Sequence, residues 1–201
     1  MNFIEFAIFI VRSEVIFVLI VVHFKIGKYL ALPGAYLRAF WEHMTCLLLG
    51  LPVENTGYLR ADEMCGHIEH FLPKKALAAY ISATAPGFMG LITGLPLVVM
   101  GVLNLRFMGV TFADSKVLFV LYIALIYIGA SIMCCLHPQF EVAQNLWDIT
   151  LNKLRSKNAK SVVGGLIMLL PALVTYIGAV LERFSVPVLV WAAGIAVIFV
   201  I

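Results

Sequence analysis

Charge is scarce in this chain. Only 12% of its 201 residues are Asp, Glu, Lys or Arg, against roughly a quarter in an average soluble domain. The 14 Lys and Arg exceed the 11 Asp and Glu to give a net charge of +3, which is too small and too scattered to indicate nucleic-acid binding. So few charges cannot solvate the surface of a soluble protein. The composition therefore excludes a cytosolic enzyme and a disordered chain.

Cysteine is also rare, and its spacing excludes a disulfide-stapled secreted module. The four cysteines are Cys46, Cys65, Cys134 and Cys135, and adjacent cysteines rarely bridge each other. We expect reduced thiols in or near a membrane. The apolar N-terminus lacks a basic region and a small-residue cleavage site, so we expect the first hydrophobic segment to stay in the mature protein.

Apolar residues are what the chain has in excess. They make up 63% of it, and the mean hydropathy is +1.03. A membrane span needs about 20 mostly apolar residues to cross about 30 Å of hydrocarbon. Four stretches meet this requirement: residues 75–103, 117–136, 161–181 and 184–201.

Two further stretches are long enough but carry polar residues. Residues 2–24 contain Arg12 and Glu14, and residues 30–53 contain Arg38 and Glu42. We therefore predict an all-α, polytopic membrane helix bundle with five or six transmembrane segments and short loops. It forms a single integral membrane domain over residues 1–201, with a C-terminal helical pair over 161–201.

One loop has its own helical pattern. Apolar residues recur at helical spacing between residues 140 and 154, among them Phe140, Leu146 and Trp147, with polar residues opposite. Such a helix either lies in the membrane interface with Trp147 at the headgroups or packs against the bundle.

Ionisable residues within membrane segments are costly, so each is a functional hypothesis. Arg12 and Glu14 stand two apart, on different helix faces, and are poor partners for each other. Arg38 and Glu42 stand four apart and share a face. This spacing fits a neutralised ion pair better than a catalytic element.

Residues 66–70 read Gly-His-Ile-Glu-His, which places His67 and His70 at a spacing seen between metal ligands. Two histidines do not make a zinc site, and a hydrated loop outside the membrane is the favoured interpretation.

Several short motifs occur in a particular order. In chain order they are Pro33-Gly34, EHMTCLLLG (42–50), GHIEHFLP (66–73), Pro86-Gly87, Ser131-Ile132, Pro138 and Asn145-Leu146-Trp147. This order resembles that of the site-two-protease-like membrane metallopeptidases of bacteria. The resemblance covers about residues 30–150 and implies a peptidase-like core there, in the bacterial cytoplasmic (inner) membrane.

The departures from this family fall on its chemistry. Its His-Glu-x-x-His helix supplies two zinc ligands and a general base. When His43 is aligned with the second histidine, Ala39 stands in place of the first and Phe40 in place of the glutamate. Cys135 occupies the position of a later histidine, and Val142 that of an aspartate. Alanine cannot bind a metal and phenylalanine cannot accept a proton, so the resemblance implies a chain that is not a peptidase and has no catalytic residues.

A residual zinc site is compatible with the aligned residues. His43, His67, His70 and Cys135 retain imidazole or thiolate groups, which bind zinc. Without a general base, such a site would be structural or regulatory. No other cofactor is expected.

The leading hypothesis is therefore a catalytically inactive, peptidase-like membrane protein that binds other integral membrane proteins or serves as a subunit of a larger complex. Its other partners would be membrane lipids, and nucleic acid is not expected.

Two alternatives remain open. One is an intramembrane zinc metallohydrolase with a rearranged site that uses His43, His67, His70 and Glu42 or Glu69. The other is a small transporter or channel whose polar path is lined by Arg12, Glu14, Arg38 and Glu42.

Overall fold

The computed structural model describes residues 29–59, 66–184 and 186–200. Within these ranges the chain forms six α-helices, a π-helical turn and one two-stranded antiparallel sheet. The elements are α2 (Leu32–Leu49), β1 (Val53–Asn55), β2 (Glu69–His70), α3 (Ala76–Val102), the π-helical turn η1 (Leu103–Phe107), α4 (Lys116–Cys134), α5 (Phe140–Leu154), α6 (Ala159–Arg183) and α7 (Val186–Val200). The predicted all-α class is confirmed.

Among the residues that the structure describes, three helices are apolar and long enough to cross a membrane. They are α3 with its π-helical continuation (Ala76–Phe107), α4 and α6. These three support the membrane character of the chain, but they are fewer than the five or six spans that we predicted. The helix α7 is apolar but short, and α2 is interrupted by Arg38 and Glu42. Residues 2–24, with Arg12 and Glu14, lie outside the described residues.

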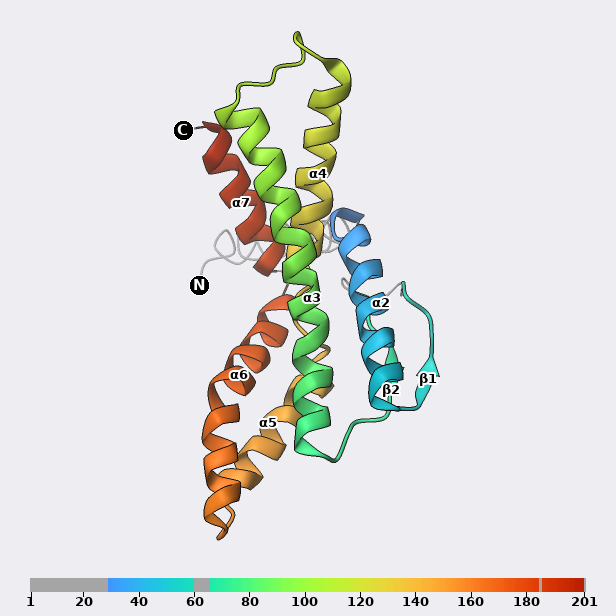
Figure 1. Cartoon of the computed structure of the whole chain (residues 1–201), viewed down its shortest axis with the longest axis vertical. Helices are drawn as coiled ribbons and strands as arrows, with labels where there is room; N and C mark the ends of the chain where they lie inside the picture. The colour runs from blue at the N-terminus through green and yellow to red at the C-terminus, as the bar shows by residue number, and fades with distance from the viewer. Residues whose placement is uncertain (1–28, 60–65, 185, 201) are drawn as a thin grey trace, which may run out of the picture.

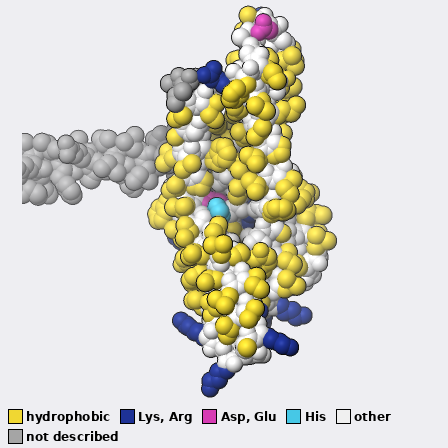
Figure 2. All heavy atoms as spheres, turned by 60° about the vertical axis from the view of Figure 1, so that its left-hand side comes forward, with side chains coloured by type: hydrophobic (Ala, Val, Ile, Leu, Met, Phe, Trp, Pro, Cys, Tyr) yellow, Lys and Arg dark blue, Asp and Glu magenta, His cyan; other side chains and the backbone are white. Residues whose placement is uncertain are grey.

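The long helix α3 organises the molecule (Figure 1). Helices α4 and α7 lie beside its C-terminal half, and α5 and α6 lie beside its N-terminal half. The helix α2 packs against both α3 and α4. The space-filling view shows a face covered mostly by hydrophobic side chains, with Lys and Arg gathered at the lower end (Figure 2).

Small residues permit the close approach of these helices. A Cβ added to Gly129 would lie 2.7 Å from the carbonyl oxygen of Gly94, so the backbones of α3 and α4 are almost in contact there. The backbone N–H of Gly34 donates to Ser131 Oγ at 2.8 Å, which joins α2 to α4. Glycines at helix contacts let backbones approach in this way in membrane bundles.

Local sequence determines where α2 begins and ends. Pro33 lies in its first turn, where a missing N–H costs no helical hydrogen bond. Gly50 ends it in the left-handed conformation with φ of 64°, and its N–H returns to the last helical carbonyls. Glycine adopts this conformation without a steric penalty. The helix that carries Arg38 and Glu42 is thus bounded by signals in its own sequence.

The amphipathic helix predicted at residues 140–154 is present as α5. It packs against α6 and α3, with Leu146 fully buried and Trp147 stacked on Tyr176 of α6. Phe140 lies against the same tyrosine. Of the two interpretations left open by the sequence, packing against the bundle describes these contacts.

Candidate functional site: a buried charged cluster

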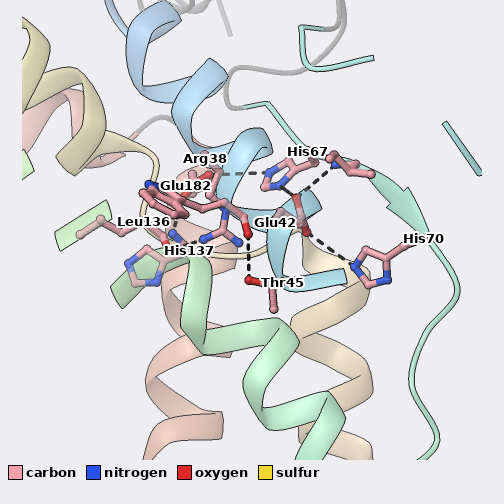
Figure 3. Close-up of polar contacts among 10 residues, drawn as sticks. Arg38, Glu42, Thr45, His67, His70, Leu136, His137 and Glu182 are labelled. Atoms are coloured by element: carbon pink, nitrogen blue, oxygen red, sulfur yellow. Dashed lines mark hydrogen bonds and ion pairs between the residues drawn. The ribbon is translucent and has the colours of Figure 1, made fainter. Parts of the chain in front are cut away.

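A cluster of ionisable side chains is buried where α2, β2 with the residues just before it, and the end of α6 meet (Figure 3). We call Arg38, Glu42, His67, His70 and Glu182 the charged cluster. Arg38 and Glu42 lie on the buried face of α2, because four residues make about one helical turn. All five side chains are buried, that of His70 with 1% of its surface exposed. Burial of this much charge requires that the groups compensate one another.

Glu42 is the centre of the charged cluster. Its Oε2 lies 3.5 Å from His67 Nδ1, and its Oε1 lies 3.7 Å from His70 Nε2. The same Oε2 accepts a hydrogen bond from the backbone N–H of Ile68 at 3.1 Å. One carboxylate therefore holds both histidines and the segment between them against α2.

Arg38 supplies a permanent positive charge beside two carboxylates. Its Nη1 donates to the carbonyl oxygen of Leu136 at 2.7 Å, and its charge acts on both Glu42 and Glu182. Its Nε and Nη2 are buried without a hydrogen-bond partner. The guanidinium therefore joins α2 to the α4–α5 connection and balances the charge of the cluster from within.

Glu182 completes the charged cluster from the last turn of α6. Its Oε2 accepts from the backbone N–H of His137 at 3.0 Å, and its Oε1 lies 3.9 Å from His67 Nε2. The pKa of His137 is lowered because burial and the nearby Arg38 both disfavour the charged ring. His137 is therefore neutral beside the cluster at physiological pH.

His70 lies at the outer edge of the charged cluster. Its Nδ1 donates to the carbonyl oxygen of Phe71 at 3.0 Å, since a carbonyl can only accept. The nearby Cys46 thiol and then the Glu42 carboxylate raise the pKa of His70 to about 10, against the opposing effect of burial. Cys46 lies one helical turn beyond Glu42 on α2, so the two side chains that raise the pKa of His70 lie on the same face of this helix.

This pKa predicts a pH dependence of stability. Because the pKa of His70 rises from 6.5 to about 10 on folding, the protonated ring stabilises the fold fully below pH 6.5. That stabilisation is lost as the pH rises through 10. We expect Cys46→Ala to lower the upper limit of this window, measured as the unfolding midpoint at a series of pH values.

His43→Gln is the matched control, because His43 bonds to Tyr58 and not to the charged cluster. A pH profile of Cys46→Ala that coincides with the wild-type profile would contradict the assignment.

A polar pocket of about 240 Å³ adjoins His70. Its lining residues are Glu54, Ile68, Glu69, His70, Leu72, Gln139, Glu141 and Val142. The pocket lies between the small sheet and the beginning of α5. His70 thus borders the pocket on one side and faces Glu42 on the other.

Of the four predicted zinc ligands, the structure brings His67 and His70 together at Glu42, and it places His43 and Cys135 elsewhere. His43 Nδ1 lies 2.7 Å from the Tyr58 hydroxyl, while His67 and His70 face Glu42. Cys135 packs with apolar residues near Val188 and is disulfide-bonded, which corrects the expectation of a reduced thiol. Within the described ranges, no group of three or more His, Cys, Asp or Glu is arranged to hold a metal ion.

The structure also places the intramembrane polar residues. Arg38 and Glu42 are neighbours on α2 as predicted, but the guanidinium donates to Leu136 instead of forming a direct hydrogen bond with Glu42. Arg12 and Glu14 lie outside the described residues.

The sequence does not single out Glu182, because this residue directly follows the apolar stretch 161–181 and lies outside the predicted membrane segments. One signal was present: a carboxylate in the last turn of a helix opposes the helix dipole, so its position called for a compensating partner.

No protein-family model matches the chain, and no curated protein or solved structure matches it either.

Proposed function

We propose that this chain is a non-hydrolytic integral membrane protein of the bacterial cytoplasmic membrane, which acts as a binding partner or subunit of a larger membrane complex. The observation that carries the proposal is how the charged cluster is used. Arg38, Glu42 and Glu182 each bind a backbone group from another part of the chain, namely Leu136, Ile68 and His137. These side chains hold α2, the histidine segment and the α4–α5 connection together.

The charge of Arg38 supports the same proposal. A guanidinium is always protonated in proteins, and here it stands beside the two carboxylates of the cluster. A divalent cation at Glu42 would meet its repulsion. The resemblance to membrane peptidases points the same way, because Ala39 and Phe40 replace the aligned histidine and glutamate.

The apolar outer faces of the spanning helices are the proposed contact surfaces. Val120 on α4 is 57% exposed, and Val174 on α6 is 55% exposed. These faces meet either lipid or the helices of a partner. Without a hydrophobic driving force between helices in lipid, partner contact depends on packing detail, so one face is expected to be used and the other to meet lipid.

Photo-crosslinking in native membranes tests the proposal. One variant carries a photoreactive residue in place of Val120, and the other carries it in place of Val174. The two valines are exposed to a similar extent, so each variant is the control for the other. We expect a discrete protein adduct from one face and lipid adducts from the other. Lipid adducts alone from both faces, together with a monomer after mild extraction, would contradict the proposal.

A further inference from the structure

Carboxylates and imidazoles alternate through the charged cluster. Glu182 Oε1 lies 3.9 Å from His67 Nε2, His67 Nδ1 lies 3.5 Å from Glu42 Oε2, and Glu42 Oε1 lies 3.7 Å from His70 Nε2. Figure 3 shows the last two contacts meeting at one carboxylate, with His67 between the two acids. The two ring nitrogens of His67 therefore face the carboxylates of Glu42 and Glu182. His70 faces Glu42 with Nε2 and the carbonyl of Phe71 with Nδ1.

We propose that Glu182, His67, Glu42 and His70 form a proton relay between the polar pocket and the buried end of α6. His70 borders this pocket, whereas Glu182 is 6% exposed and has its carboxylate inside the bundle. Rows of Asp, Glu and His in membrane proteins are the groups that carry protons. The relay is independent of the partner-binding function proposed above.

The transfer can be followed atom by atom. His70 gives the proton on Nε2 to Glu42 Oε1, and rotation of the Glu42 carboxyl group then brings this same proton to His67 Nδ1. His67 then gives the proton on Nε2 to Glu182 Oε1. A turn of the neutral His70 ring exposes its Nε2 to the pocket, where water returns a proton to that nitrogen. One proton moves inward and no electrons are transferred. The reverse sequence returns His67 to its first tautomer.

The separations suit this chemistry. Distances of 3.5 to 3.9 Å exceed those of a hydrogen bond by less than about 1 Å, so a small side-chain movement makes each contact in turn. Glu42 Oε1, His67 Nδ1 and His70 Nε2 are buried without a hydrogen-bond partner. These atoms are therefore free to accept or donate the transferred proton.

The other polar and charged groups near the two ends of the relay offer no alternative path for the proton. Beside Glu182 stand Arg38, which stays protonated, the backbone N–H of His137 and the Cys134 thiol. Beside His70 stands Cys46. The pocket adds Glu54, Glu69 and Glu141 at the outer end, and their negative charge concentrates protons at the entrance.

The experiment follows the protonation of Glu182 in the full chain in lipid nanodiscs. Infrared difference spectra after a pH jump record the band of a buried protonated carboxyl, which is assigned by its loss in Glu182→Gln. We expect His67→Gln and His70→Gln to slow the appearance of this band at least tenfold. His43→Gln is the matched control and keeps the wild-type rate, because His43 bonds to Tyr58 outside the row.

Circular dichroism of each variant establishes that it is folded before its rate is compared. Two results would overturn the relay. One is a Glu182 band that responds equally fast in folded His67→Gln and in the wild type. The other is the absence of any Glu182 band that changes with pH.

Discussion

Replacing Arg38 with methionine is expected to lower the free energy of unfolding by about 3–5 kcal/mol, the usual cost of removing one partner from a buried charged group. Arg38 is 3% exposed and acts on both Glu42 and Glu182. Without it, two carboxylates share the buried site with only the histidines to compensate them. The Leu136 carbonyl also loses its donor. The measurement is a denaturation curve in mixed detergent micelles.

Arg183→Met is the matched control, because Arg183 is exposed, directly follows Glu182 and only approaches the ring of Phe140. Its substitution is expected to change stability by less than about 1 kcal/mol. Glu182→Gln added to Arg38→Met is expected to recover part of the loss, because one uncompensated charge is removed. Equal stability of the two single variants would show that Arg38 does not balance the cluster.

Replacing Gly34 with alanine is expected to cost about 1–3 kcal/mol, as overpacking does in a close-packed core. A Cβ at this position would collide with the backbone carbonyl of Ser131 on α4. Backbone cannot rotate away as a flexible side chain can, so α2 must shift. The hydrogen bond from Gly34 N–H to Ser131 Oγ weakens at the same time.

Because α2 carries Arg38, Glu42 and Cys46, this shift is expected to change the pKa of His70 as well as the stability. Gly194→Ala on α7 is the control, since its added Cβ meets nothing within 4 Å and alanine favours a helix over glycine. The measurements are denaturation curves and the imidazole titration by NMR. Wild-type values for both in Gly34→Ala would contradict the close contact between α2 and α4.

The helices that are long and apolar enough to cross a membrane were predictable because their signal is local. The apolar runs over 75–103, 117–136 and 161–181 correspond to α3, α4 and α6. The run over 184–201 forms only the 15-residue helix α7, with Pro187 in its first turn. A run of apolar residues predicts a membrane helix. Where α6 ends and α7 begins, near Phe184, depends on how the two helices pack.

The candidate site was predictable only in its pieces. The spacing of Arg38 and Glu42, and of His67 and His70, is visible in the sequence. The adjacent Glu42 and His43 are not distinguished by spacing alone. In the fold, Glu42 faces the charged cluster whereas His43 bonds to Tyr58. A rotation of about 100° per residue separates their directions, and the packing of α2 decides which one is buried.

The sequence by itself determined that this chain is helical and apolar enough for a membrane, because composition and hydropathic runs act within each segment. It also determined the ends of α2, through Pro33 and Gly50. Only the tertiary structure decided that Glu182 joins Glu42 through His67, and that Arg38 balances both carboxylates. The reason is physical: buried charges are compensated by groups close in space, and the packing of α2, α4 and α6 brings together residues that lie far apart along the chain.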